Sequence, residues 1–139
     1  MKYLIIIFVI AFSFASCSPL ETARLTGMSL KPFKTKGKIY SQTFEKDLST
    51  CYKETEKIIK SFEALLYRGS LKKGFIVSMG YNQIFPSASY STEVALFFTG
   101  VDKNKTKIQI SSLNHNLSEF ISEKIFQELK NPNLPESNN

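Results

Sequence analysis

The sequence predicts a two-layer α+β domain, in which two amphipathic helices cover one face of a mainly antiparallel sheet of about four strands. Apolar residues recur at helical spacing in two stretches, 43–67 and 116–130. Between them lie three short runs rich in β-branched and aromatic residues, 75–81, 90–99 and 106–113. With a short strand before the first helix, the expected order is strand, helix, three strands, helix.

The first strand is expected over residues 37–42, and Ser41 or Thr43 can cap the helix that follows it. This helix should end near Tyr67, where Gly69 supplies the stop. Lys46 belongs to its polar face. Its buried stripe follows the spacing of one helix face and comprises Phe44, Leu48, Cys51, Tyr52, Thr55, Ile58, Ile59, Phe62 and Leu65.

Residues 100–105 form a polar, turn-forming segment that is short enough for a hairpin, so the last two strands should be antiparallel neighbours. Alternation along a strand then separates two sets of side chains. The set expected in the core is Val94, Leu96, Phe98, Ile108 and Ile110, and the set facing away is Glu93, Ala95, Phe97, Lys107, Gln109 and Ser111.

Asn116 with Glu119 three residues later forms a capping-box arrangement, which predicts the start of the last helix. The helix should run to about Lys130 and stop at Asn131-Pro132. Its expected buried stripe is Leu117, Phe120, Ile121, Ile125 and Leu129. A single α+β domain is therefore expected over 37–131, with a disordered tail at 132–139.

The N-terminus has the layout of a secretory signal peptide over residues 1–16. One positive charge, Lys2, precedes an apolar run from Leu4 to Phe14, and small residues follow directly before Cys17. The apolar run of about 11 residues is short against the roughly 20 that a helix needs to cross a bilayer. Cleavage is therefore expected rather than a permanent transmembrane anchor.

The segment Phe14-Ala15-Ser16-Cys17 resembles the lipobox of bacterial lipoproteins. The resemblance implies that a peptidase cuts just before Cys17 after its thiol has been acylated, and a multiply acylated cysteine holds a protein on a membrane. Residues 17–36, with Pro19, Gly27 and Pro32, then form the lipidated N-terminus and a flexible tether. The alternative is ordinary signal cleavage, which would leave Cys17 as an exposed thiol in an oxidising compartment.

The end of this tether is basic. Each of its lysines could gain up to about 1 kcal/mol near an anionic membrane surface, although an ordinary solvated linker is the alternative; these lysines are Lys31, Lys34, Lys36 and Lys38. Ser18 rather than Asp follows the cysteine. In a host with two membranes, the lipoprotein resemblance then implies the outer membrane, facing the periplasm.

Composition excludes several kinds of function. Removing the signal leaves 17 basic and 12 acidic side chains. Nucleic acid is not an expected partner, because the chain is expected to be exported and its basic residues are dispersed.

Cys51 is the one other thiol, so neither an intramolecular disulfide nor a cysteine-based metal site can form; we expect Cys51 in the core. His115 is the only histidine and is expected in a loop or helix cap. No cofactor or metal site is predicted.

No catalytic constellation is apparent, and an enzyme is not expected. The sequence has no HExxH, no glycine-rich phosphate loop and no GxSxG. Glu93, placed within a strand beside apolar neighbours, is the one acid whose position invites a catalytic interpretation. A cross-strand pair with Lys107 is the simpler expectation.

Two features could instead bind a partner. The loop 81–90 is rich in apolar area and could carry a site, or its side chains could fold back over the edge of the core; they are Tyr81, Ile84, Phe85 and Tyr90. The second feature is the sheet face away from the helices, with Phe97 and Ala95 beside either Ile76 or the set Phe75, Val77 and Met79. An apolar patch there favours a protein partner or a homodimer, unless the tether covers it.

The predicted order of elements resembles that of small bacterial lipoproteins of uncharacterised function. The similarity covers most of the mature chain and rests on Cys17 and on the stretches 44–52, 73–76 and 106–113. At the level of fold, the order is also similar to accessory lipoprotein domains of the outer-membrane barrel-assembly machinery, which bind proteins and catalyse nothing. The leading expectation is a membrane-anchored, non-enzymatic domain that binds or stabilises another envelope protein, and it rests on the anchor, the missing catalytic set and the apolar second face of the sheet. The alternative is a module for lipid, glycan or peptide near Tyr81, Phe85 and Tyr90.

Overall fold

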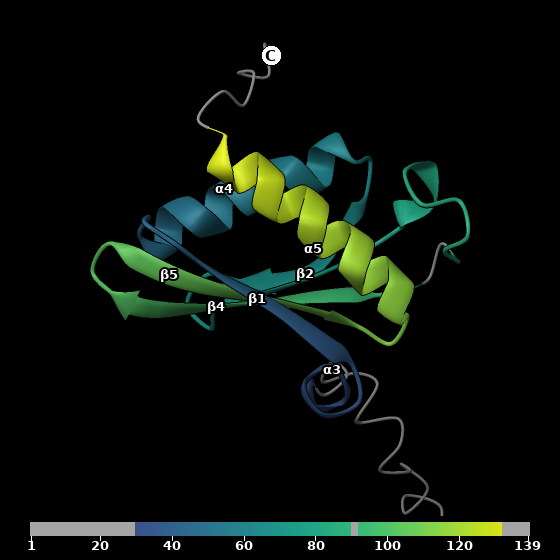
Figure 1. Cartoon of the computed structure of the whole chain (residues 1–139), viewed down its shortest axis with the longest axis horizontal. Helices are drawn as coiled ribbons and strands as arrows, with labels where there is room; N and C mark the ends of the chain where they lie inside the picture. Colours follow the sequence, from purple (N-terminus) through teal and green to yellow (C-terminus); the bar gives the residue numbers. More distant parts are fainter. Residues whose placement is uncertain (1–29, 90–91, 132–139) are drawn as a thin grey trace, which may run out of the picture.

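The computed structural model describes residues 30–89 and 92–131, which form an α+β domain built on one five-stranded antiparallel sheet. The strand order is β1-β5-β4-β3-β2. Helices α4 and α5 lie on one face of this sheet, and the short helix α3 lies on the other (Figure 1). In chain order the elements are α3 (Lys31–Thr35), β1 (Lys38–Phe44), α4 (Leu48–Ser61), β2 (Leu65–Ser70), β3 (Phe75–Met79), the 3-10 turn η1 (Tyr81–Gln83), β4 (Val94–Asp102), β5 (Lys105–Ser112) and α5 (His115–Lys130).

The predicted fold class is confirmed, and the described residues add one strand and one helix to it. The expected signal peptide, Cys17, most of the tether, Tyr90 and the C-terminal tail lie outside the described residues. The helix expected over 43–67 is wrong at both ends. Ser41 and Thr43 belong to β1. At the other end, residues 65–67 belong to β2 instead of the helix.

Helix α4 begins at Leu48 because Asp47, not Ser41 or Thr43, is its N-cap. One oxygen of the Asp47 carboxylate accepts the Thr50 backbone N–H at 3.1 Å, and the other accepts the Thr50 hydroxyl at 2.6 Å. The helix ends at Ser61, and Glu63 adopts a left-handed backbone with φ of 57°. The chain therefore turns back before Leu65, whose apolar spacing had matched the helix by coincidence.

Gly69 has a different role from the predicted helix stop. It lies in β2, where a Cβ would stand 2.5 Å from the Tyr52 hydroxyl oxygen. Glycine thus lets a side chain of α4 reach over the strand. Gly74, in the turn between β2 and β3, has φ of 63° and passes close to Phe98, whose backbone N–H donates to the Gly74 carbonyl at 2.8 Å.

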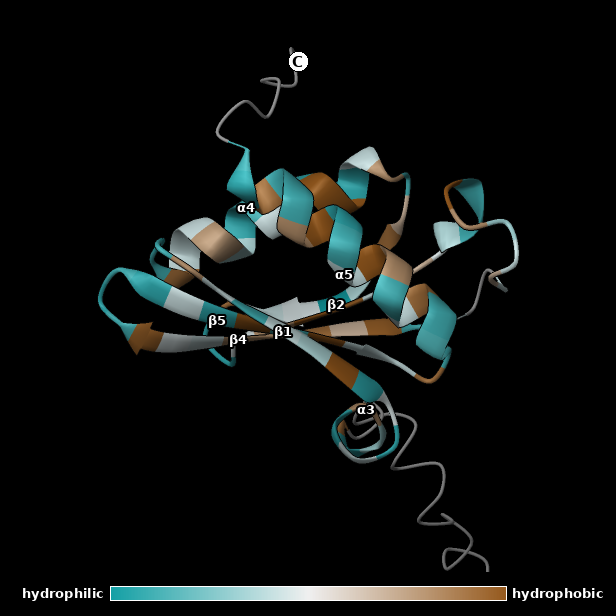
Figure 2. Ribbon diagram, viewed as in Figure 1, coloured by the Kyte–Doolittle hydropathy of each residue, from teal (hydrophilic) through white to brown (hydrophobic). Residues whose placement is uncertain are grey.

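The β4–β5 hairpin forms as predicted, with Leu96 opposite Ile110 and Phe98 opposite Ile108. These side chains face α4 and α5 and form the centre of the main core. Both helices, which lie over this face of the sheet, alternate between hydrophobic and hydrophilic residues (Figure 2). Cys51 is fully buried there, also as predicted, and burial raises the pKa of its thiol. The main core comprises Phe44, Cys51, Tyr52, Ile58, Ile59, Ala64, Ile76, Tyr81, Ala88, Val94, Leu96, Phe98, Ile108, Ile110, Leu117, Ile121, Ile125 and Leu129.

Lys46 lies in the connection between β1 and α4 instead of on a helix face. Its ammonium donates to Glu54 at 2.6 Å and to the Leu129 carbonyl at 3.0 Å, near the C-terminal end of α5. The Lys46 carbonyl accepts the Thr106 hydroxyl at 2.9 Å. One residue thereby joins both long helices and the sheet.

The N-cap of α5 is Asn114 rather than Asn116. The side-chain oxygen of Asn114 accepts the Leu117 backbone N–H at 3.1 Å. Strand β5 runs to Ser112, and the Ser112 hydroxyl accepts the Asn114 N–H at 3.2 Å, so the helix starts earlier than its sequence pattern suggests. Asn116 is an exposed residue within the helix.

Replacing Asn114 by Ala should lower the free energy of unfolding by about 1 kcal/mol, because the N-terminus of α5 loses its side-chain acceptor. Asn116→Ala is the matched control and should change stability by only a few tenths of a kcal/mol. Urea unfolding followed by circular dichroism measures both. Equal losses in the two variants would contradict the assigned cap.

The cap of α4 predicts a pH dependence. Hydrogen bonds from Thr50 hold the pKa of Asp47 below its usual value of 3.8. The ionised carboxylate therefore stabilises the folded state above the unfolded pKa, and this contribution is lost as the pH falls through the folded pKa. The stability difference between the wild type and Asp47→Asn should thus shrink from pH 7 to pH 3 in urea unfolding. A difference that is constant over this range would contradict the assignment.

Candidate binding surface

The sheet has a second apolar face, opposite α4 and α5, which we call the outer face. Strand alternation sends Ile76 into the main core and places Phe75 and Val77 on the outer face, beside Ala95 and Phe97. This settles which side of β3 packs on the helices, a choice that the sequence left open because both sides of the strand are apolar.

Helix α3 covers much of this face. The Phe33 side chain is 4% exposed and packs on the four strand residues, with Leu30 against them. We call this group the outer cluster; its members are Phe33, Phe75, Val77, Ala95 and Phe97. The prediction that residues up to 36 form a tether is therefore wrong for its last part, because Lys31–Thr35 is a helix packed on the domain. Of the two alternatives for Phe97, cover by the N-terminal segment is the arrangement observed.

Two close contacts hold α3 in place. The Ser111 hydroxyl of β5 donates to the Phe33 carbonyl at 2.7 Å. Gly37 lies against the same serine, and a Cβ at this position would stand only 2.1 Å from the Ser111 hydroxyl oxygen. The outer face therefore needs glycine at the junction of α3 and β1.

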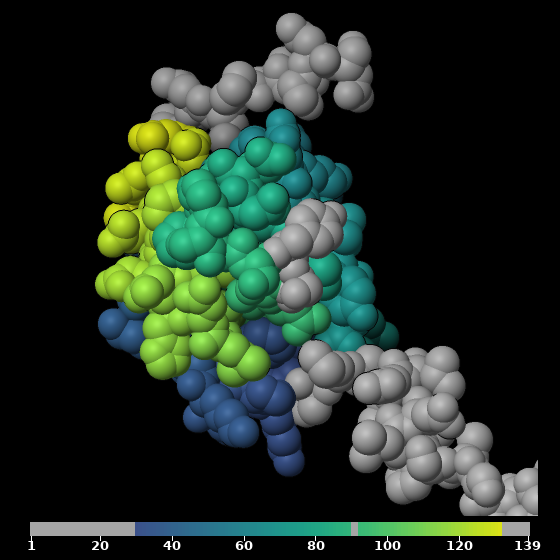
Figure 3. All heavy atoms as spheres, turned by 90° about the vertical axis from the view of Figure 1, so that its right-hand side faces the viewer, coloured from purple at the N-terminus to yellow at the C-terminus, as the bar shows by residue number. Residues whose placement is uncertain are grey.

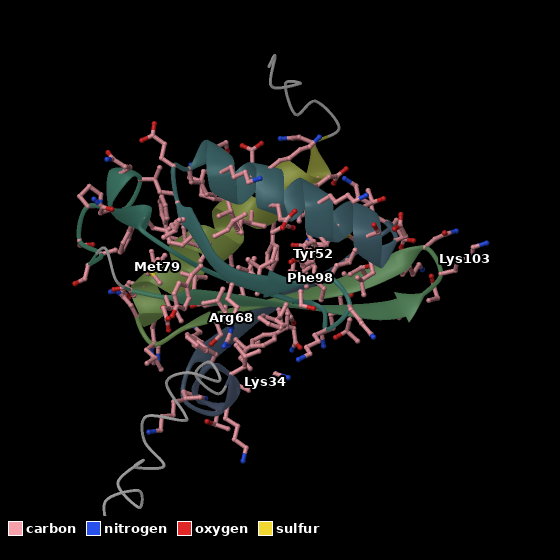
Figure 4. All side chains as sticks on the ribbon, turned by 180° about the vertical axis from the view of Figure 1, so that it is seen from behind. Lys34, Tyr52, Arg68, Met79, Phe98 and Lys103 are labelled. Atoms are coloured by element: carbon pink, nitrogen blue, oxygen red, sulfur yellow. The ribbon has the colours of Figure 1, made fainter. Side chains whose placement is uncertain are left out.

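Cations lie over the aromatic rings of the outer cluster. The Lys34 ammonium is 4.7 Å from the Phe97 ring centroid, and the Arg68 guanidinium is 5.4 Å from that of Phe75. Figure 4 shows both side chains on the α3 side of the sheet, away from Tyr52 and Phe98. Such contacts stabilise exposed sites by about 0.5–1 kcal/mol each. The outer face thus combines an apolar centre with basic groups at its surface.

A cavity of about 230 Å³ lies at one end of the outer face, lined by Phe33, Thr92, Glu93 and Leu113. The predicted pair of Glu93 with Lys107 is wrong, because Lys107 lies opposite Thr99 in β4 and Thr43 in β1, well along the strand from Glu93. Among the described residues that line the cavity, Glu93 is the one titratable group, so they supply no second acid or base beside it. The volume is also below the roughly 300–1,000 Å³ of common small-molecule sites.

In the predicted binding loop, of which residues 81–89 are described, the large apolar side chains pack mainly inward. Tyr81 is fully buried, and its hydroxyl and the Ser78 hydroxyl are 2.5 Å apart. Burial raises the pKa of the Tyr81 phenol. Ile84 and Phe85 are partly buried against the main core, and the Phe85 ring centroid lies 5.2 Å from that of Phe120 in α5. Figure 3, which faces this end of the molecule, shows residues 81–89 beside α5.

Three of the six exposed large apolar residues in the described part of the chain lie in or just after β2, whose start was predicted to be helical; the other three, Ile39, Val101 and Leu113, lie apart from one another in the sequence. Tyr67 is 59% exposed, Leu65 49% and Leu71, in the following turn, 37%. Among the described strands β2 pairs with β3 alone, and its register shifts between Leu66 and Arg68. The shift leaves Tyr67 without an opposite residue, as in a β-bulge.

Residues 30–89 and 92–131 contain no group of three His, Cys, Asp or Glu side chains placed to hold a metal ion. Within the same ranges, no helix has both the length and the apolar character required to cross a membrane. His115 is exposed at the first position of α5.

No protein-family model matches the chain, and no curated protein matches it.

Removing the Phe33 ring should uncover the outer cluster. We expect Phe33→Ala to lower the free energy of unfolding by about 3 kcal/mol, as large-to-small changes at buried aromatic residues do, and to increase binding of a hydrophobic fluorescent dye. Lys36→Ala, an exposed change just after the same helix, is the control and should alter neither quantity. Unchanged stability and dye binding in Phe33→Ala would show that α3 does not cover this face.

Proposed function

We propose that this protein is a lipid-anchored, non-enzymatic envelope protein whose domain binds or stabilises another envelope protein. The anchor rests on the signal-like residues 1–16 and on Cys17. The protein-binding part rests on one structural observation, the exposed apolar edge formed by Leu65, Tyr67 and Leu71.

This edge has the properties of a contact surface. It lies at the end of the sheet, where a strand has backbone groups free to meet another chain. One of its three apolar side chains is a tyrosine, a residue type that is enriched where proteins meet. The β-bulge disfavours a long continuous strand pairing with a partner. We therefore expect the partner to contact mainly these side chains.

The non-enzymatic part of the proposal rests on the distribution of titratable groups. Glu54, in α4, pairs with Lys46, and Glu45, at the end of β1, pairs with Lys105 at 3.2 Å. Glu93 faces a small cavity whose other described lining side chains are Phe33, Thr92 and Leu113. A general acid works with a positioned base or nucleophile beside the reacting atom; the described lining supplies none to Glu93, and the other two carboxylates are held in ion pairs.

Photo-cross-linking in the native host tests the binding surface. A photoreactive amino acid at position 67 of the full-length protein should capture one defined envelope protein, which mass spectrometry identifies. The same group at Lys57, exposed on α4, is the control and should capture that protein far less. Equal capture at both positions, or none at position 67, would contradict the proposed edge.

The anchor is tested separately. Metabolic labelling with an alkyne fatty acid should mark the wild-type protein and not Cys17→Ala, and the wild type should fractionate with membranes. Label that persists in Cys17→Ala, or an unlabelled wild type, would contradict acylation at this residue.

A further inference from the structure

The net positive charge of the described residues belongs to the sheet layer alone. The helix layer, residues 46–63 and 114–131, has six basic and seven acidic side chains, a net charge of −1. The remaining described residues, which form α3, the strands and their turns, have ten basic and three acidic side chains, a net charge of +7. The two layers of the domain therefore present very different electrostatic surfaces.

Part of this charge lies on the outer face and part in the turns at the ends of the strands, whereas Lys38 lies on the helix side of the sheet, over the Tyr40 ring. Lys107 projects from β5 on the side opposite Ile108 and Ile110. Lys34 and Arg68 lie over the rings of the outer cluster. Lys72, Lys73 and Lys103 are exposed in the turns at the ends of the strands.

The few acids of the sheet layer offset little of this charge. Glu45 is paired with Lys105. The Asp102 carboxylate accepts the Asn104 backbone N–H at 2.8 Å within the β4–β5 turn. Glu93 lies beside the cavity at the other end of the face. The outer face thus matches an extended anionic surface better than a small ligand.

The chain enters the domain on this same face. Helix α3 begins at Lys31, 14 residues after Cys17, and a chain of that length spans at most about 50 Å. Because Phe33 and Ser111 fix α3 on the outer face, a lipid on Cys17 would hold the domain by this face. Each lysine near an anionic bilayer strengthens attachment about fivefold.

We infer that the outer face, with α3, docks on the anionic phospholipid headgroups of the membrane that anchors the protein, and that α4, α5 and the edge at β2 remain available to a protein partner. This orientation rests on the proposed lipid anchor. It assigns different tasks to the two layers: the sheet contacts the membrane and the helices face away from it.

The test uses the full-length protein purified from its host and reconstituted in nanodiscs that contain phosphatidylglycerol and a nitroxide-labelled headgroup lipid. A fluorophore is placed on Ser41→Cys, exposed on the outer side of β1, or on Lys57→Cys, exposed on α4; buried Cys51 does not compete for the label. We expect at least twofold stronger quenching at position 41. In phosphatidylcholine nanodiscs the two positions should differ much less.

Charge removal supplies the matched control. The combined change Lys72→Gln, Lys73→Gln and Lys107→Gln should bring the quenching ratio close to one, whereas Lys53→Gln, Lys60→Gln and Lys124→Gln, in the helix layer, should leave it unchanged. Stronger quenching at position 57, or equal effects of the two triple variants, would overturn the proposed orientation. So would an unquenched position 41, which a protein covering this face would produce.

Intact-protein mass spectrometry reports acylation independently. If Cys17 carries no lipid, the anchor fails, and docking is then read from co-sedimentation of the same protein with phosphatidylglycerol vesicles. Co-sedimentation that the sheet-layer triple variant loses at least tenfold supports the docking face by itself. Equal co-sedimentation with phosphatidylcholine vesicles overturns it.

Discussion

Two neighbouring inner strands of this sheet, β3 and β4, bury side chains on both faces, and this constraint shapes the whole domain. Every residue from Phe75 to Ser78 and from Val94 to Phe98 is buried. A sheet of this kind must exclude water from both faces. Two long amphipathic helices cover one face, and the N-terminal segment supplies Phe33 for the other.

That division has a functional consequence. The same segment that covers the outer cluster connects the domain to residues 1–29, so the cover and the proposed anchor are consecutive in the chain. A domain attached in this way has a preferred side toward its attachment, and its charge follows the same division between layers. The exposed apolar edge at β2 is the strand furthest from β1 in the sheet order, where a partner can approach it.

Hydrophobic periodicity predicted correctly the elements that pack one whole face on the main core. The β4–β5 hairpin and the buried stripe of α5 follow from alternation and helical spacing, because each packs one complete face on the main core. The same pattern wrongly places Leu65 and Tyr67 in the helix, because their spacing continues its apolar stripe although the chain has turned at Glu63. A left-handed residue other than glycine gives no sequence signal of comparable strength.

The outer face was only partly predictable. Alternation placed Ala95 and Phe97 there, and the alternative that the N-terminal segment covers them was open from the sequence. What the sequence could not supply was the specific contact: Phe33 has no helical stripe around it, and its partner Ser111 is 78 residues away. The proposed binding residues Tyr81, Ile84 and Phe85 were chosen for apolar content in a loop, which does not distinguish a binding loop from one that closes the core.

The contact on which this account depends most is that between Phe33 and the outer face. Nuclear Overhauser effects measured on the full-length protein test it directly. Cross-peaks from the Phe33 ring to the Val77 methyl groups and the Phe97 ring are the predicted result. A Phe33 ring that shows none of them, with chemical shifts of an exposed residue, would contradict the two-sided sheet and the orientation inferred from it.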